Sequence, residues 1–136
     1  DLDPVAEKHQ VRLIQTDGDC TVTGSYILLY RAVYNLVENA IKYNRPSGSV
    51  TVSIHTAESA VLEVTDTGIG ISPENQEKIF DPFYRVDKSR SRAMGGAGLG
   101  LALVSEIARQ HNGQVKVTQS SEKGSTIALM LPVTLL

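Results

Sequence analysis

The longest run of regularly spaced apolar residues extends from Tyr26 to Asn44. Its apolar side chains recur at steps of three and four residues, which is the spacing of one face of an α-helix. They are Ile27, Tyr30, Val33, Tyr34, Val37 and Ile41, with Leu29, Leu36 and Ala40 broadening the face. Ser25 is a good N-cap, and Pro46 disfavours helical geometry at the residue before it. The sequence therefore predicts a long helix that ends before Arg45.

Shorter patterns on both sides of this helix predict a sheet and further helices. Helical signals occupy residues 3–8, 72–79 and 99–111. Alternating apolar and polar residues predict β segments at 11–16, 20–23, 49–55, 60–65, 114–119 and 125–131. Short turns between neighbouring segments indicate hairpins. We expect an α+β two-layer sandwich, with a mixed, mainly antiparallel sheet of about five strands covered on one face by three helices.

Composition and charge narrow the class of protein. The chain has 136 residues, which suits one domain, and its 41% hydrophobic and 21% charged residues are typical of a soluble globular protein. A net charge of −2 argues against a nucleic-acid surface. Cys20 is the sole cysteine, so no disulfide forms within the chain. Neither a membrane span nor a signal peptide is evident, and a start at Asp1 without Met suggests a fragment.

One polar line interrupts the apolar central helix. Asn35, Glu38, Asn39 and Lys42 stand at positions i, i+3, i+4 and i+7, so they project from one side as a row. Their oxygens suit a Mg²⁺ ion that keeps water and phosphate as its other ligands, and the Lys42 ammonium suits the phosphate. The alternative is that the row is the solvated edge of an amphipathic helix.

A second candidate site follows the predicted strand 60–65. Asp66 stands at its end, with Gly68 and Gly70 next to it, and glycines permit close backbone approach to a ligand. A buried carboxylate there can accept a hydrogen bond from an exocyclic amine such as that of adenine. An ordinary Asp-x-Gly turn is the alternative. The Gly-Ser-Thr stretch at 124–126 closes a hairpin and brings a hydroxyl toward the same pocket, unless it is only a polar turn.

A glycine cluster precedes the last predicted helix. Gly96, Gly98 and Gly100 place free backbone N–H groups at a helix N-terminus, which forms an anion site. The cluster is not a Walker loop, because no Gly-Lys-Ser/Thr follows it. It is not a dinucleotide fingerprint either, because Leu103 stands where the third glycine would fall. A flexible hinge is the alternative.

In this order and spacing, the motifs resemble the catalytic and ATP-binding domain of two-component sensor histidine kinases. That domain has the Bergerat fold and belongs to a superfamily that includes DNA gyrase, the Hsp90 chaperones and the MutL repair proteins. Residues 35–44 resemble its N box, 66–70 its first glycine box and 96–101 its second, and 124–126 its last glycine motif. Phe-Asp-Pro-Phe-Tyr-Arg at 80–85 matches the F box, which is typical of the kinase branch. The resemblance covers nearly the whole chain.

The resemblance implies roles for the N-box residues. Asn39 would be a Mg²⁺ ligand. Glu38 would be the catalytic residue, which polarises the attacking imidazole or orders a metal-bound water. Asn35 and Lys42 would lie along the phosphates of ATP, and Tyr43 would pack near the base or ribose.

The glycine boxes would hold the rest of the nucleotide. By the resemblance, Asp66 would receive the adenine amine, and Gly68 and Gly70 would let the backbone pass the purine. The remaining nucleotide-binding residues that it implies are Ile71, Arg85, Gly96, Gly98, Leu99, Gly100 and Thr126. Among these, Arg85 is a candidate for contacting the γ-phosphate, and Thr126 would sit near the adenine. The ATP lid would span about residues 84–98.

The acceptor histidine is expected to lie elsewhere. The family's phospho-acceptor stands in a His-Glu or His-Asp context on a separate helical domain, and His9, His55 and His111 lack that context. We interpret His55 as a strand residue and His111 as a helix-end residue. The family often has Gly-Asp before the N-box helix, where this chain has Gly24 and Ser25, and that difference does not threaten nucleotide binding.

The resemblance thus implies a catalytic domain that binds ATP and Mg²⁺. In its parent it would phosphorylate a histidine of the dimerisation domain, for relay to a response regulator. We expect it in the cytoplasm, without contact to nucleic acid or membrane, and the parent is a candidate inner-membrane sensor. The alternatives are an anti-sigma-type serine kinase and a non-catalytic interaction module with a degenerate pocket. A gyrase- or chaperone-like ATPase is less favoured, because it needs further domains.

Overall fold

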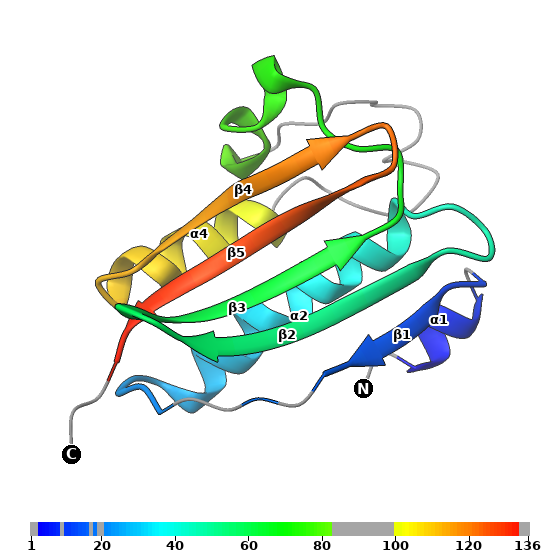
Figure 1. Cartoon of the computed structure of the whole chain (residues 1–136). Coiled ribbons are helices and arrows are strands. Elements are labelled where there is room, and N and C mark those ends of the chain that lie inside the picture. Colours follow the sequence, from blue (N-terminus) through cyan, green and yellow to red (C-terminus); the bar gives the residue numbers. More distant parts are fainter. Residues whose placement is uncertain (1–2, 9, 17, 19–20, 83–99, 134–136) are drawn as a thin grey trace.

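The structure is a computed structural model, and it describes residues 3–8, 10–16, 18, 21–82 and 100–133. These form two layers, with a sheet in front and the helices α2 and α4 behind it (Figure 1). The helices are α1 (Asp3–Lys8), α2 (Tyr26–Lys42) and α4 (Gly100–Gln110), and the 3-10 turns are η1 (Pro73–Asn75) and η2 (Lys78–Phe80). The strands are β1 (Arg12–Gln15), β2 (Ser49–Thr56), β3 (Ser59–Asp66), β4 (Gln114–Ser121) and β5 (Gly124–Pro132). The expected α+β sandwich is confirmed.

The sheet has five strands in the order β1-β2-β3-β5-β4. Strand β1 runs parallel to β2, with Arg12 opposite Ser49, and α2 lies in the connection between them. All other neighbours pair antiparallel, as expected for hairpins. In this register the last residue of β3, Asp66, lies opposite Ser125 of β5. The sheet therefore brings the first glycine box and the last glycine motif together.

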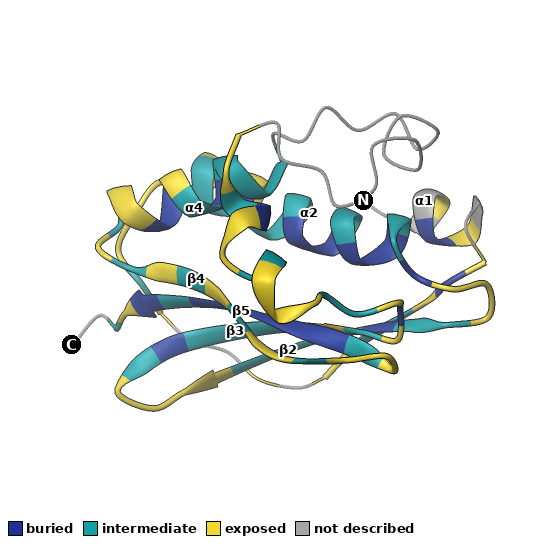
Figure 2. Cartoon of the chain, turned by 90° about the horizontal axis from the view of Figure 1, so that it is seen from above, coloured by how far each residue is buried: buried dark blue, intermediate teal, exposed yellow. Residues whose placement is uncertain are grey.

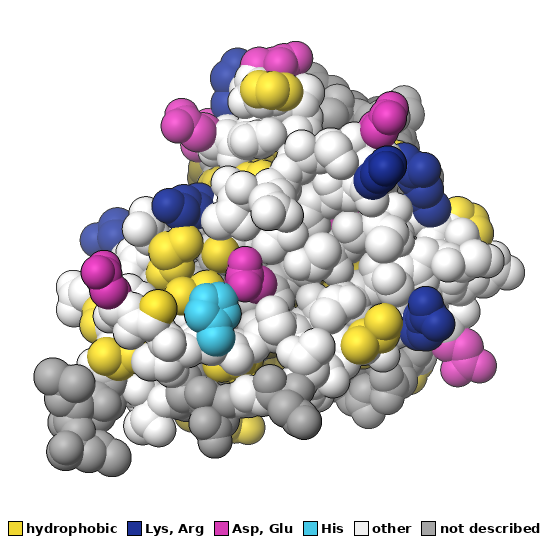
Figure 3. All heavy atoms as spheres, viewed as in Figure 1, with side chains coloured by type: hydrophobic (Ala, Val, Ile, Leu, Met, Phe, Trp, Pro, Cys, Tyr) yellow, Lys and Arg dark blue, Asp and Glu magenta, His cyan; other side chains and the backbone are white. Residues whose placement is uncertain are grey.

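The core lies between the sheet and the helices, where the buried residues gather (Figure 2). The largest fully buried side chains come from both layers: Leu36, Ile41, Val50, Val64, Val104 and Ile107. On the other face of the sheet most visible atoms belong to the backbone or to uncharged polar side chains, with some hydrophobic side chains among them, as Figure 3 shows. The helices thus cover one face only, as predicted. Within the described residues, no helix has the length and apolarity needed to cross a membrane.

Two predicted elements differ from the structure. Residues 21–23 form no strand, and Cys20 lies outside the described residues. No neighbouring strand in the described sheet pairs with this segment, and Val22 packs against the core instead. The predicted helix at 72–79 is two separate 3-10 turns, η1 and η2. Local bonds favour the tight turn, because Asn75 donates through its backbone N to the Ser72 carbonyl at 2.9 Å and through Nδ2 to Ser72 Oγ at 2.7 Å.

Candidate functional site

The polar row of α2 lies along the half-buried rim of this helix. Ser25 begins the helix as predicted, because its Oγ accepts a hydrogen bond from the Leu28 N–H at 3.3 Å. Further along, Glu38 Oε1 lies 3.8 Å from Lys42 Nζ, and both side chains are about a quarter exposed (27% and 24%). An ion pair at this depth contributes little to stability, roughly 0–1 kcal/mol. Both charged groups therefore remain available to a ligand at the rim.

Asn35 faces the first residue of α4. Its Nδ2 donates to the Arg31 carbonyl at 2.8 Å, and a Cβ added at Gly100 would lie 3.0 Å from its Oδ1. Glycine at position 100 therefore lets the start of α4 approach α2 closely. The N–H groups in the first turn of α4 have no partner within the helix, which suits them to binding an anion beside Asn35. The other predicted glycine-box residues, Gly96, Gly98 and Leu99, lie outside the described residues, as do Arg85 and the lid segment 84–98.

Asn39 is placed between Asn35 and the end of the helix. Its backbone carbonyl accepts the Tyr43 N–H at 3.2 Å, and Tyr43 is the C-cap of α2. The Asn39 side chain is half-buried and has no hydrogen bond to any described residue. A carboxamide oxygen with no partner among the described residues suits a Mg²⁺ ion, which needs only a few protein oxygens. Among the described residues there is no cluster of three or more His, Cys, Asp or Glu placed for a metal ion. A Mg²⁺ ion that keeps phosphate oxygens and water as ligands does not need one.

Asp66 is the centre of a second group of hydrogen bonds. Its Oδ1 accepts the Gly68 N–H at 2.9 Å and the Ser125 N–H at 3.3 Å, and its Oδ2 accepts from Ser125 Oγ at 3.0 Å. Burial raises the pKa of the Asp66 carboxyl above its ordinary value, although the hydrogen bonds from Gly68 and Ser125 act in the opposite direction. The carboxyl is therefore fixed in direction and only partly shielded from a ligand.

The hydroxyl beside Asp66 belongs to Ser125, which the sequence reasoning did not select. Thr126 is one residue further along β5, and its Oγ1 lies 2.9 Å from Oγ1 of Thr65. Because side chains alternate between the faces of a sheet, the pair Thr65 and Thr126 lies on the face opposite to Asp66 and Ser125. Both Ser125 and Thr126 are buried. The signal that identifies Ser125 is its register with Asp66, which requires knowledge of how the two strands pair.

The glycines of the first glycine box lie at close backbone contacts within the protein. A Cβ added at Gly68 would lie 2.5 Å from the Tyr43 carbonyl oxygen. Gly70 has φ of +79°, and a Cβ there would lie 2.0 Å from the Ser121 carbonyl oxygen. The Ile71 N–H donates to Ser120 Oγ at 2.6 Å. The loop after β3 is therefore held between the end of α2 and the β4–β5 hairpin, which brings Asp66 close to the C-terminal end of α2, where the polar row ends.

A buried asparagine that the sequence reasoning did not single out joins these segments. Asn44 follows α2, and its Nδ2 donates to the Ser49 carbonyl at 2.8 Å. Its Oδ1 accepts from Thr67 Oγ1 at 2.9 Å and from the Arg45 N–H at 2.8 Å. Thr67 Oγ1 in turn accepts the Ser49 N–H at 2.9 Å. The network ties the end of the N box to the start of β2 and to the first glycine box.

The two described histidines have the structural positions expected of them. His55 lies in β2, with Nδ1 3.6 Å from Glu63 Oε1 on the open face of the sheet. His111 directly follows α4. Neither lies in the group formed by the polar row and Asp66. His9 lies outside the described residues.

Comparison with known proteins gives the family. The family described as "Histidine kinase-, DNA gyrase B-, and HSP90-like ATPase" matches residues 24–135. The chain is 46% identical over 123 residues to the sensor-like histidine kinase SenX3 of Mycobacterium tuberculosis, covering 88% of this chain and 30% of SenX3. It is also 46% identical over 101 residues to the sensor histidine kinase WalK of Bacillus subtilis, covering 72% of this chain and 16% of WalK.

Solved structures agree in fold. The mycobacterial sensor histidine kinase MprB superposes with a TM-score of 0.83 at 30% identity, covering 99% of this chain and 91% of that chain. The histidine kinase ThkA, solved in complex with the response regulator protein TrrA, superposes with a TM-score of 0.77 at 22% identity, covering 98% of this chain and 37% of that chain. This likeness concerns the fold alone. The chain spans less than a third of the length of SenX3.

The named relatives favour a histidine kinase over the serine-kinase and non-catalytic alternatives. The family match covers all four elements that carry the predicted site, namely α2, the end of β3, the start of α4 and β5. The chain belongs to the histidine kinase-, DNA gyrase B- and HSP90-like ATPase family, as an ATP-binding catalytic domain of the sensor histidine kinase type.

Proposed function

We propose that this domain binds Mg-ATP between the polar row of α2, the first turn of α4 and the loop after β3. In its full-length parent it transfers the γ-phosphate to a histidine of the dimerisation domain, which passes it to an aspartate of a response regulator. The observation that carries this proposal is the contact of Gly68 with the Tyr43 carbonyl, because it sets Asp66 beside the α2 row. An adenine-binding carboxylate and phosphate-binding groups then share one edge of the domain.

At the adenine end, Asp66 accepts a hydrogen bond from the exocyclic amine of the base. Ser125 and the Gly68 N–H hold the carboxylate in place from the protein side, through contacts at 3.0 and 2.9 Å. Tyr43 and Ile71 flank the base from the end of α2 and the loop after β3. Removing the carboxylate takes away the group that distinguishes adenine from a base without the amine, so binding depends strongly on Asp66.

At the phosphate end, the work is positioning and neutralisation of charge. Asn35 and Lys42 lie along the phosphates, and the free amides at the start of α4 point to the same anion. Asn39 would hold the Mg²⁺ ion, which neutralises charge on the phosphates when bound, and Glu38 would help order a metal-bound water. Glu38 also polarises the attacking imidazole of the acceptor histidine. The imidazole nitrogen forms a bond to the γ-phosphorus while the bond to ADP breaks, and ADP leaves.

The proposed partners follow from this chemistry. ATP and response regulators meet in the cytoplasm, so this domain works there, and its parent is a candidate inner-membrane sensor. The related fold of ThkA was solved with a response regulator, TrrA, which supports a response regulator as the downstream partner. The net charge of −2 supports the expectation that the domain binds no nucleic acid.

The test is titration calorimetry with ADP and with a non-hydrolysable ATP analogue, with and without Mg²⁺. We expect micromolar binding by the native chain and at least a roughly tenfold loss, about 1.4 kcal/mol, in Asp66→Asn. The matched control is Glu58→Gln, which neutralises an exposed carboxylate at the β2–β3 turn and should bind normally. No heat and no thermal stabilisation with any nucleotide would overturn the proposal and favour a non-catalytic module.

A further inference from the structure

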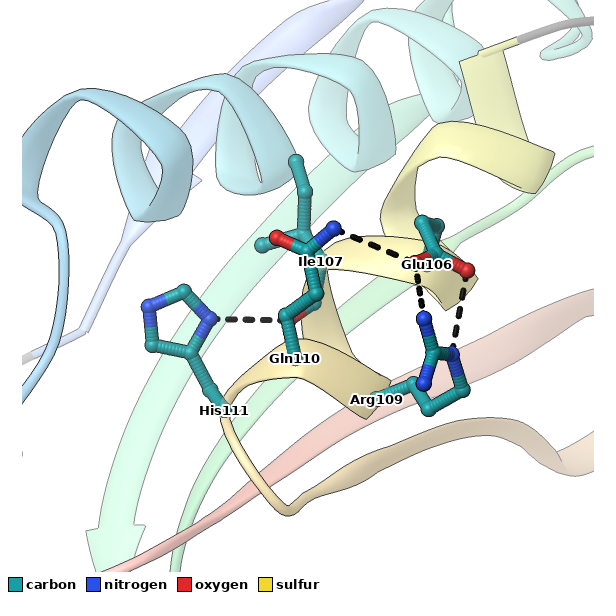
Figure 4. Close-up of polar contacts among 5 residues, drawn as sticks. All are labelled: Glu106, Ile107, Arg109, Gln110 and His111. Atoms are coloured by element: carbon teal, nitrogen blue, oxygen red, sulfur yellow. Dashed lines mark hydrogen bonds and ion pairs between the residues drawn. The ribbon is translucent and has the colours of Figure 1, made fainter.

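The end of α4 contacts the start of α2 through one imidazole. Nε2 of His111 accepts the Ser25 N–H at 3.1 Å. Nδ1 lies 2.8 Å from the Ile107 carbonyl oxygen, a contact drawn in Figure 4. A carbonyl oxygen only accepts, so the proton of the ring is on Nδ1 and the lone pair of Nε2 faces Ser25. Both ring nitrogens are therefore engaged, one within α4 and the other on α2.

This contact completes the N-cap of α2. In a capping box, the N-cap hydroxyl accepts the N–H of the third helical residue, and a Glu at that position accepts the N–H of the cap. Ser25 Oγ does accept the Leu28 N–H, but Leu28 has no side-chain acceptor to return. His111, from the neighbouring helix, supplies the missing acceptor. A Cβ added at Gly24 would lie 2.3 Å from Cδ2 of this ring, so glycine makes room for it.

The same two helices meet again where the start of α4 lies against the middle of α2. Gly100 at the start of α4 lies against Asn35 of α2, where an added Cβ would come within 3.0 Å of Asn35 Oδ1. About ten residues separate Ser25 from Asn35 and about eleven separate Gly100 from His111, so both spans measure about 15–16 Å along the helix axis. The two helices are thus antiparallel, and the Ser25–His111 and Asn35–Gly100 contacts lie about equally far apart on each helix. A shift of α2 at Ser25 moves Asn35 relative to the anion-binding end of α4.

We propose that His111 is a positioning residue for phosphate binding. Its contact with Ser25, which we call the His111 clasp, sets the register of α2 against α4 and so aligns Asn35 with the first turn of α4. This inference rests on the proposed function. At the adenine end, the hydrogen-bonding groups Asp66 and Ser125 lie on β3 and β5, and no hydrogen bond among the described residues joins them to His111 or Ser25.

The proposal therefore predicts that loss of the His111 clasp weakens binding of the phosphates and leaves binding of the adenine almost unchanged. In His111→Phe the ring shape remains and both polar contacts are lost. We expect the affinity for ADP and the non-hydrolysable ATP analogue to fall about tenfold, while adenosine affinity, measured by NMR shift titration, stays within about twofold. His111→Gln should recover part of the loss, because a carboxamide both accepts and donates. Equal losses for adenosine and ADP, or no loss for either, would overturn the proposal.

A matched control lies on the same turn of α4. Among the described residues, Arg109 pairs only with Glu106, through its Nε at 3.1 Å and through Nη2, and it has no polar contact with α2 there (Figure 4). Arg109→Ala should leave both affinities unchanged. If His111→Phe fails to fold, Gly24→Ala displaces the ring without removing it, and the same selective loss is expected.

A measurement without nucleotide separates failure of the clasp from failure of the proposed function. In ¹⁵N NMR spectra His111 should show a protonated Nδ1 and an unprotonated Nε2, and the Ser25 amide should lose protection from hydrogen exchange in His111→Phe. Native protein that binds no nucleotide, yet shows this tautomer and this protection, would contradict the proposed function alone. The opposite tautomer would refute the clasp whatever the nucleotide result.

Discussion

Replacing Ser125 with alanine removes one of three hydrogen bonds to the half-buried carboxylate of Asp66. The Oγ of Ser125 donates to Asp66 Oδ2 at 3.0 Å, and Gly68 N–H and Ser125 N–H remain at 2.9 and 3.3 Å. Hydrogen bonds to charged groups contribute about 1.5–3 kcal/mol, and Asp66 is only partly buried, so we expect a loss of about 1–2 kcal/mol in unfolding free energy. For a domain of this size that lowers Tm by roughly 3–8 °C.

The loss should depend on pH. Burial raises the pKa of Asp66 and the Ser125 hydroxyl acts to lower it, so the variant raises that pKa further. Because a raised pKa favours the protonated carboxyl in the folded state, stability falls as pH rises through the titration of Asp66. The difference between native protein and Ser125→Ala should therefore be small in acid and grow as Asp66 ionises. Urea unfolding across the acid range measures it.

The neighbouring hydroxyl provides the control. Thr126→Val removes the contact with Thr65 on the opposite face of the sheet and keeps the side-chain shape. It should cost only about 0.5–1.5 kcal/mol, with no change in pH dependence or nucleotide affinity. Ser125→Ala should weaken ADP binding about fivefold, if Asp66 is held less firmly by about 1 kcal/mol. A pH-independent loss in Ser125→Ala, or weaker nucleotide binding in Thr126→Val than in Ser125→Ala, would refute this assignment.

Two further substitutions test how the site is held together. Gly70→Ala places a Cβ 2.0 Å from the Ser121 carbonyl oxygen, at a residue whose φ is +79°. It should lower the unfolding free energy, measured in urea, by at least about 2 kcal/mol. A change under about 0.5 kcal/mol would contradict the close contact. Asn44→Ala removes the hydrogen bonds to the Ser49 carbonyl and Thr67 Oγ1, which keep their contacts with each other. We expect a loss of about 1–3 kcal/mol by the same assay, and a near-neutral effect would refute the network.

Local patterns were sufficient for the elements that carry the predicted site. The three- and four-residue spacing predicted α2, and Ser25 was predicted as its cap. The alternation of apolar and polar residues predicted β2, β3, β4 and β5 to within about two residues at each end. It does so because each strand has one face on the core and one in solvent. The polar row needed nothing beyond helical spacing. These features depend on residues close together in the sequence.

What the sequence did not reveal depends on partners far away in the chain. Ser125 and Thr126 are indistinguishable until the register of β5 with β3 is known, since one residue of shift exchanges the faces. Asn44 was one polar residue among several at the end of a helix until Ser49 and Thr67 came beside it. Residues 21–23 have β-forming side chains but no neighbouring strand in the described sheet, so they form none.

The parallel pairing of β1 with β2 divides the domain into parts of unequal resistance to opening. Four residue pairs join these strands, and α2 separates them in the chain, whereas β2, β3, β5 and β4 form a continuous antiparallel ladder. The unit of α1 and β1 is thus the piece whose local unfolding disrupts the fewest contacts of the sheet. None of the described site residues lies on it. Nucleotide binding therefore stabilises the domain against global unfolding by mass action. The free energy for local release of β1 from the edge of β2 should be the same with and without bound nucleotide.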